Sequence, residues 1–198
     1  MQESKISLSP AEKALFEDAQ IILTKNSILQ KTTALASAVQ TVLQDEAPLF
    51  IRNVSPPPKI SRGENYLGLP YVILDYPRIA AGDDLLFIRS LFWWGNFYSS
   101  TLQLSGKYKE AHRENIEKAY DALAAKDYSV GIQQDPWIHH FGADNYKAIN
   151  ALSKEAFVLS LEEIPHIKVA ARWPLSEWDR ATNNLIESWR RLMNLVEV

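Results

Sequence analysis

The sequence of 198 residues contains no cysteine. Without cysteine the chain can form no disulfide, no thiolate nucleophile, and no zinc or iron–sulfur site with cysteine ligands. A chain of this length buries enough surface to fold without such crosslinks. A cysteine-free composition also fits a reducing compartment, and we expect the protein to be cytoplasmic.

The chain has no strong excess of charge of either sign. Its net charge of −3 is small, and it is the wrong sign for a nucleic-acid-binding protein. No apolar run approaches the roughly 20 residues that span a bilayer. The opening segment MQESKISLSPAEK lacks the apolar stretch of a signal peptide. The sequence therefore predicts neither a nucleic-acid partner nor a membrane.

Glycine is scarce, and the known site motifs are missing. The seven glycines are scattered, so a loop that cradles phosphate groups is not expected. We find no GxGxxG, Walker A, HExxH, GxSxG or EF-hand pattern. The motifs therefore predict no cofactor.

Aromatic and strand-forming residues are abundant, and they concentrate in residues 65–106. The run 69–76 suits a strand. Pro77 should end this strand, because proline has no N–H to donate to a sheet. The segment 79–84, which contains Gly82, then predicts a turn.

Two further strands are predicted at 85–94 and 97–104. The Gly95-Asn96 pair between them indicates a tight hairpin, because glycine supplies the positive φ that such turns require. The alternative is one strand bent at Gly95, which would far exceed the usual strand length of about 5–6 residues. The strand 85–94 is apolar on both faces apart from Arg89, so we expect it to lie centrally and to be covered on both sides.

Helices are predicted before and after this strand-rich segment. The residues of a capping box at 9–12 start a pair of helices over 9–46, with a bend near Asn26. Residues 47–60 contain three successive prolines and predict a stiff linker. Residues 61–198 form the sheet-centred core, which ends in an amphipathic helix.

The order of these elements predicts one α+β domain over residues 1–198. We expect a mainly antiparallel sheet of about four to six strands, with an N-terminal helical hairpin and the C-terminal amphipathic helix packed on it. Alternation at 167–173 predicts a half-exposed edge strand. The alternation at 137–141 fits either a short strand or an extended loop.

Three segments carry a resemblance to a known family. They are GENYLGLPYVILDYPR (63–78), FWWGNF (92–97) and LSGKY (104–108). They resemble segments of a family of uncharacterised bacterial proteins of about this length, and the resemblance covers most of the chain. It implies no activity, cofactor or catalytic residue.

Polar residues that interrupt the apolar strands form the first candidate site. Asp75 and Arg89 lie on strands predicted to be neighbours, and a buried charge needs a partner, so a structural ion pair is the simplest interpretation. The functional alternative is a pocket for a small anionic ligand, because arginine binds carboxylate and phosphate, and aromatic walls are typical of ligand sites. The candidate residues of this pocket are Tyr71, Asp75, Tyr76, Arg78, Arg89, Trp93, Trp94 and Asn96.

Asp135, His139 and His140 form the second candidate site. Imidazole and carboxylate groups suit zinc, nickel or iron. Adjacent histidines in a strand point to opposite faces, so only one of them could face a given metal ion, and further ligands would have to come from elsewhere. The structural alternative is a polar loop in which His139 is hydrogen-bonded locally.

These observations favour a non-catalytic binding or interaction protein for a small anionic ligand, with the N-terminal helices as the contact of a homodimer. The alternative is a metal-assisted hydrolase that uses Asp135, His139 and His140, with Arg78 or Arg89 holding an anionic substrate. The sequence does not decide whether the protein is an enzyme.

Overall fold

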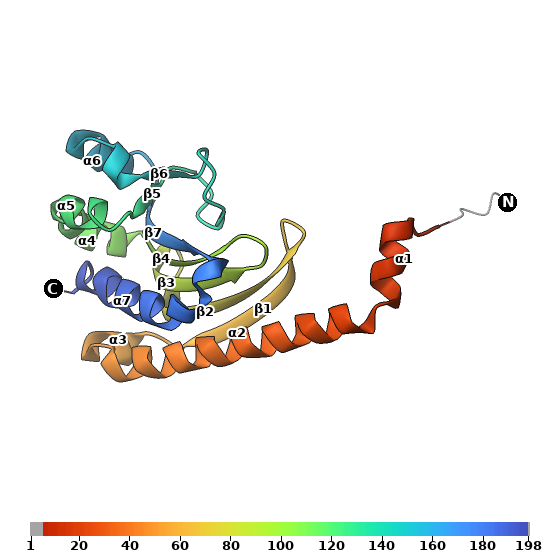
Figure 1. Ribbon diagram of the computed structural model, residues 1–198. Coiled ribbons are helices and arrows are strands. Elements are labelled where there is room, and N and C mark those ends of the chain that lie inside the picture. The colour runs from red at the N-terminus through yellow and green to blue at the C-terminus, as the bar shows by residue number, and fades with distance from the viewer. Residues whose placement is uncertain (1–5, 198) are drawn as a thin grey trace.

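The computed structural model describes residues 6–197, and Figure 1 shows their arrangement. Residues 1–5, part of the opening segment without signal-peptide character, lie outside the described range. The strands are β1 (Lys59–Tyr66), β2 (Leu69–Ala81), β3 (Asp84–Trp93), β4 (Phe97–Ser105), β5 (Ser129–Gly131), β6 (Tyr146–Ala148) and β7 (His166–Pro174).

All seven strands form one sheet in the order β1-β2-β3-β4-β7-β5-β6. Every neighbouring pair is antiparallel. The helices are α1 (Pro10–Glu17), α2 (Ala19–Glu46), α3 (Leu49–Val54), α4 (Lys107–Lys118), α5 (Tyr120–Ala124), α6 (Lys154–Glu162) and α7 (Ala181–Asn194), with short 3-10 turns η1 (Ile149–Ala151) and η2 (Leu175–Arg180). The α+β class with an antiparallel sheet and helices at both ends is confirmed. The predicted strand number of four to six was too low.

β2 does not end at Pro77 as predicted. The strand continues to Ala81, and its register with β3 shifts between Asp75 and Arg78. Pro77 therefore falls where the ladder is already interrupted, and its missing N–H is tolerated there. The turn that follows is shorter than expected, with Gly82 at φ +61°.

The predicted hairpin between β3 and β4 is present. Trp93 pairs with Phe97, so the loop has three residues, one more than predicted. Gly95 has φ +69° and is the third residue of a turn in which Asn96 N donates to the Trp93 carbonyl at 3.1 Å, a position that favours glycine when φ is positive. β3 lies between β2 and β4, as the apolar character of both its faces indicated.

β7 is not the edge strand that its alternating residues predicted. It lies between β4 and β5, and residues 166–171 are buried. The prediction failed because a lysine in the strand was taken to face solvent, whereas Lys168 is only 1% exposed. The irregular segment 132–145 covers Lys168. The alternation of apolar and polar residues in a strand does not show whether another segment lies over its polar face.

The predicted linker 47–60 and helical hairpin also differ from the structure. Most of the linker forms α3 and the start of β1. α2 continues unbroken through Asn26, and the chain bends at Asp18 instead, whose side chain accepts a hydrogen bond from Gln20 N at 2.9 Å. α1 does not fold back along α2 but leaves it at an angle, as Figure 1 shows. The capping box between Ser9 and Glu12 is confirmed.

The two faces of the sheet are covered differently. One face packs against the helices, and its core joins residues such as Ile88 of β3, Leu43 of α2 and Trp189 of α7. The opposite face has a smaller core of Ile73, Leu91, Trp93 and Phe97. Segment 132–145, the teal loop of Figure 1, lies on this second face. No helix between Ile6 and Glu197 is long and apolar enough to cross a bilayer.

Candidate functional site

The predicted ion pair between Asp75 and Arg89 is confirmed on the second face. The two residues are directly opposite each other in β2 and β3. Arg89 Nε donates to Asp75 Oδ1 at 2.7 Å and Arg89 Nη2 donates to Asp75 Oδ2 at 2.9 Å. The side chains are only 16% and 12% exposed. This bidentate geometry satisfies both charges where little water reaches them.

His139 joins the pair to the covering loop. Its Nε2 lies 2.9 Å from Arg89 Nη1. A guanidinium only donates, so Nε2 accepts, and the imidazole is neutral with its proton on Nδ1. Burial, together with the nearby charges of Arg89 and Lys168, lowers the pKa of His139 to about 3. His139 therefore stays uncharged at neutral pH.

Tyr66 holds the same loop from the end of β1. Its hydroxyl oxygen accepts the backbone N–H groups of His139 at 2.7 Å and His140 at 3.1 Å. The Tyr66 ring packs edge-on against Trp93, with ring centroids 5.0 Å apart. Trp93 Nε1 donates to the Tyr66 carbonyl at 3.1 Å. Tyr66 is thus fixed on both sides and in turn positions His139 over the sheet.

These groups border a cavity of about 170 Å³, which we call the Arg89 pocket. Its lining side chains are Tyr66, Tyr71, Ile73, Arg89, Leu91, Trp137 and His139. Trp137 is 46% exposed and forms the outer wall, with its ring centroid 5.5 Å from the Arg89 guanidinium carbon. Asp135 supports this wall, since its Oδ1 accepts the backbone N–H of Trp137 at 2.8 Å.

The Tyr71 wall depends on a glycine in β1. A Cβ atom at Gly63 would come within 2.5 Å of the Tyr71 ring. Gly63 pairs with Tyr71 across β1 and β2, and the register of the two strands shifts just after it. Glycine therefore leaves room for the Tyr71 ring against the β1 backbone, beside Tyr66 at a centroid distance of 6.4 Å.

Lys168 of β7 adds a buried positive charge beneath the loop. Its Nζ donates to the carbonyl of Ile138 and lies 4.9 Å from the centroid of the Tyr146 ring. The pKa of Lys168 is lowered to about 8, mainly by burial; the Asp135 charge opposes this lowering and the Arg89 charge adds to it. Gly131 makes room for the side chain, because a Cβ there would come within 2.8 Å of Lys168 Cβ.

The structure gathers only some of the predicted ligand residues at the pocket. Tyr71 and Arg89 line it, and Asp75 supports Arg89. Trp93 lies behind Tyr66. Tyr76 belongs to the opposite face, because adjacent strand residues alternate, and its ring stacks on Trp189 at 6.4 Å.

The other predicted ligand residues lie away from the pocket. Arg78 follows the bulge of β2 and its Nε donates to the Pro57 carbonyl at 2.6 Å. Trp94 and Asn96 form the β3–β4 loop, where Asn96 Nδ2 donates to the Trp94 carbonyl at 2.9 Å. Sequence reasoning missed Lys168 as a site residue, left Tyr66 out of the ligand set, and included His139 only as a metal ligand.

The predicted metal residues do not converge on one point. His139 Nε2 faces the guanidinium of Arg89, a cation. His140 Nδ1 instead accepts the backbone N–H of Gly142 at 3.1 Å. Asp135 binds the Trp137 backbone. Across residues 6–197, no three or more histidine, aspartate or glutamate side chains are grouped so that they could hold a metal ion.

Comparison with known proteins finds no matching family model, no matching curated protein and no matching solved structure. The resemblance to a family of uncharacterised bacterial proteins therefore stays a prediction.

Proposed function

We propose that the chain is a cytoplasmic, non-catalytic binding protein and that the Arg89 pocket takes a small anion with a flat apolar body. The main support for this proposal is the set of hydrogen-bond donors left free at the pocket. The charge and the shape of the pocket give further support.

The polar groups at the pocket have unused donors rather than unused acceptors. Arg89 has five N–H groups, of which three are taken by Asp75 and His139. The Tyr66 hydroxyl accepts two backbone N–H groups and keeps its own proton to donate. His139 keeps its Nδ1 proton. Both Asp75 oxygens already accept from Arg89, so a ligand that offers acceptor oxygens, such as a carboxylate, fits this set.

The charges on this face of the sheet also favour an anion. Asp75 cancels the charge of Arg89, but Lys168 donates to a neutral carbonyl and not to an acid. Arg172 likewise lies over aromatic rings, with its guanidinium carbon 5.0 Å from the centroid of Phe141. Lys168 acts on the pocket residue His139, Asp135 partly offsets the Lys168 charge, and Arg172 adds a further positive charge on this face. The resulting field attracts negative charge.

The size and walls of the pocket favour a flat ligand. Its volume of about 170 Å³ is close to the roughly 150 Å³ of a protein cavity that holds one benzene ring. Tyr66, Tyr71 and Trp137 provide aromatic surfaces on several sides. The lining side chains include no serine, threonine or carboxylate, and the Nε2 lone pair of His139 is already engaged. This set suits binding better than catalysis.

Thermal-shift measurements with benzoate and benzamide test the proposal. The two probes share a ring, but only benzoate carries a charge. Benzoate should raise the melting temperature, with a stabilisation of about 2.7 kcal/mol when its concentration is one hundred times Kd. Benzamide should bind at least about tenfold more weakly. Equal shifts for both probes, or no shift for either, would contradict the proposal.

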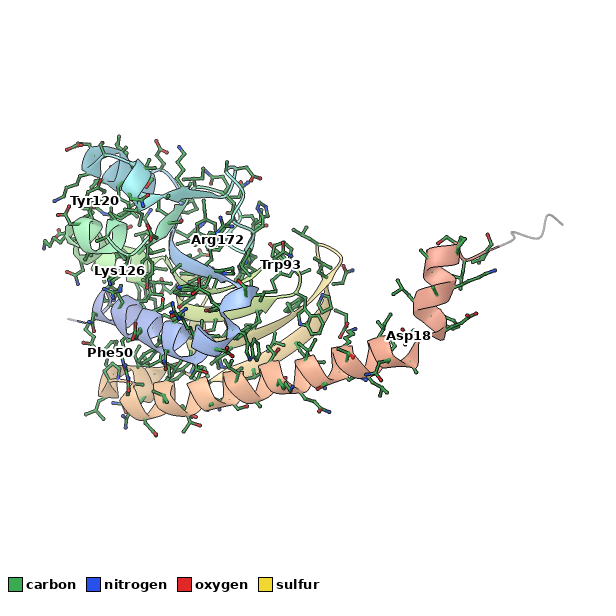
Figure 2. All side chains as sticks on the ribbon, in the orientation of Figure 1. Asp18, Phe50, Trp93, Tyr120, Lys126 and Arg172 are labelled. Carbon is green, nitrogen blue, oxygen red and sulfur yellow. The ribbon has the colours of Figure 1, made fainter. Side chains whose placement is uncertain are left out.

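A pair of aromatic variants tests the location. Trp137→Ala removes the exposed outer wall and should weaken benzoate binding about tenfold or more, with little loss of stability. Phe50→Ala is the matched control, because Phe50 is similarly exposed and lies on α3 at the helical side of the protein, as Figure 2 shows. The control should bind benzoate like the unaltered protein.

A further inference from the structure

The apolar stripe of α2 is longer than the surface that covers it. Its residues recur every seven positions, at 22, 29, 36 and 43 and beside them at 21, 28, 35 and 42. The C-terminal part of the stripe, with Ala36, Val39 and Leu43, is buried in the main core. The N-terminal part, with Ile21, Ile22 and Ile28, is exposed. The sequence thus continues a packing surface beyond the point where the sheet ends.

The uncovered part projects from the protein. We call residues 10–31 the helical arm, and they comprise α1 and the first turns of α2. Figure 1 shows α1 and the start of α2 extending past the sheet, and Figure 2 shows side chains beyond Asp18 directed into open space. The end of the arm reaches the protein body, where Leu29 packs against the main core. α1 has no buried residue, and Phe16 is 82% exposed. Because so short a helix is marginal alone in water, the arm needs a surface to pack against.

An apolar groove of about 300 Å³ lies at the base of the arm. It runs between α2 and the β3–β4 hairpin, and its lining residues are Ile28, Thr32, Phe92, Trp93, Trp94, Gly95, Leu175 and Trp178. The same chain therefore carries a projecting apolar helix and an uncovered apolar groove. A two-fold dimer can satisfy both at once, because each copy offers the same two surfaces.

We propose that a second copy of the chain covers the arm, with the two α2 helices antiparallel and the two-fold axis passing near Ile22. In this register residue i of one copy lies opposite residue 44 − i of the other. The two α2 helices then pair over residues 19–25, and the next turn of each α2 holds Ile28, which lines the groove. The bend at Asp18 turns α1 away from the axis of its own α2. α1 therefore leaves the pair of α2 helices near the groove of the second copy.

The charges of the arm favour the same orientation. Acidic residues Glu12, Glu17 and Asp18 lie toward its start, and basic residues Lys25 and Lys31 lie toward its end, with Lys13 as the exception. In the proposed register Lys25 of one copy lies opposite residue 19 of the other, next to Asp18, whereas a parallel pair would set Lys25 against Lys25. Lys25 also contacts Glu64 of its own chain at 2.5 Å, so it would lie between two carboxylates.

Cysteine crosslinking tests the register. The chain has no cysteine, so Ile22→Cys introduces a single thiol that should meet its own copy at the axis. Mild oxidation should then convert most of the protein to a covalent dimer. Thr41→Cys is the control, because this exposed position on the same helix lies far from the arm, and it should stay mostly monomeric. Equal crosslinking of both variants, or of neither, would overturn the proposed register.

Light scattering on the full chain tests the dimer itself. The unaltered protein should have twice the 22.5 kDa mass of one chain. The double variant Phe16→Glu, Ile22→Glu should be a monomer with an unchanged circular dichroism spectrum. Leu159→Glu, at an exposed leucine of α6, should remain a dimer. A monomeric unaltered protein, including one that binds lipid vesicles through the arm, would overturn the proposal, as would a dimer that survives the double variant.

Discussion

Asp75 and Arg89 form a bidentate ion pair across β2 and β3, with donor–acceptor distances of 2.7 and 2.9 Å. The pair leaves one edge of the guanidinium for His139, 50 residues further along the chain. One arginine thereby joins two strands of the sheet to the loop that covers them. The same arginine lines the pocket. It therefore has two roles, one in holding the fold together and one in binding a ligand, and each can be measured.

Arg89→Ala should lower the free energy of unfolding by about 3–5 kcal/mol, because it leaves the Asp75 carboxylate buried without a partner. The double variant Asp75→Leu, Arg89→Met should cost less than the sum of the single changes, because no charge is left unpaired. Urea unfolding followed by circular dichroism measures both. An unchanged urea midpoint for Arg89→Ala would show that the pair does not stabilise the fold.

The free energy of unfolding should decrease as the pH is lowered, because His139 titrates. Its pKa is about 6.5 in the unfolded chain and is lowered to about 3 in the folded protein. The unfolded state therefore binds the proton first, so the stability is complete above about pH 6.5 and is lost as pH falls toward 3. Between pH 7 and pH 4, protonation of His139 should lower the free energy of unfolding by about 2 kcal/mol. This figure is less than the full pKa difference gives, because the ring keeps some contact with water.

The His139→Gln variant isolates this contribution. Urea unfolding at several pH values should show a shallower decline than in the unaltered protein. His166 contributes in the same window, because burial lowers its pKa to about 4, so some decline should remain. Identical pH profiles for the two proteins would contradict the assignment.

The pKa of Lys168 should be about 8 in the folded protein, against about 10.4 for an ordinary lysine. The folded state gives up this proton first, so stability should rise as pH increases from about 8 toward 10.5. An anion in the Arg89 pocket should raise the pKa, because a nearby negative charge favours the ammonium form. Carbon-13 NMR of the lysine Cε atoms measures the titration with and without benzoate. A Lys168 midpoint near 10.5 would show that burial does not perturb it.

Gly63→Ala should displace the Tyr71 ring and cost about 1–3 kcal/mol in stability, because its Cβ would come within 2.5 Å of that ring. Benzoate binding should weaken with the loss of this wall. Thermal unfolding and calorimetry measure the two effects. Gly63→Ala made together with Tyr71→Leu should lose less stability than Gly63→Ala alone, since the smaller side chain can move aside. Equal losses of stability in the single and double variants would show that the new Cβ does not clash with the Tyr71 ring.

Much of the site could be predicted where residues interrupt a regular pattern. Asp75 and Arg89 were recognisable as a pair because each lies in an apolar strand, and the hairpin at Gly95 placed β3 beside β4. The contact that Tyr66 makes with the covering loop could not be found in this way. Its hydroxyl meets the backbone of His139, 73 residues away, and segment 132–145 has no periodicity that would predict its path.

Lys168 shows a second limit of sequence patterns. Alternation identifies which residues share a face of a strand, but it does not show what lies above that face. The α2 stripe has the same limit, since its regular repeat shows which residues share a face of the helix but not how much of that face is covered. Only the structure shows that the sheet ends before the stripe does.

An amide NMR titration of the unaltered protein with benzoate tests the central claim most directly. If the Arg89 pocket binds the anion, the largest shifts should come from the backbone amides of His139 and His140 and from the indole N–H of Trp137. They should saturate together with one dissociation constant. Shifts concentrated at the groove residues Trp94 and Trp178, or no saturable shifts, would contradict the proposed binding function of this pocket.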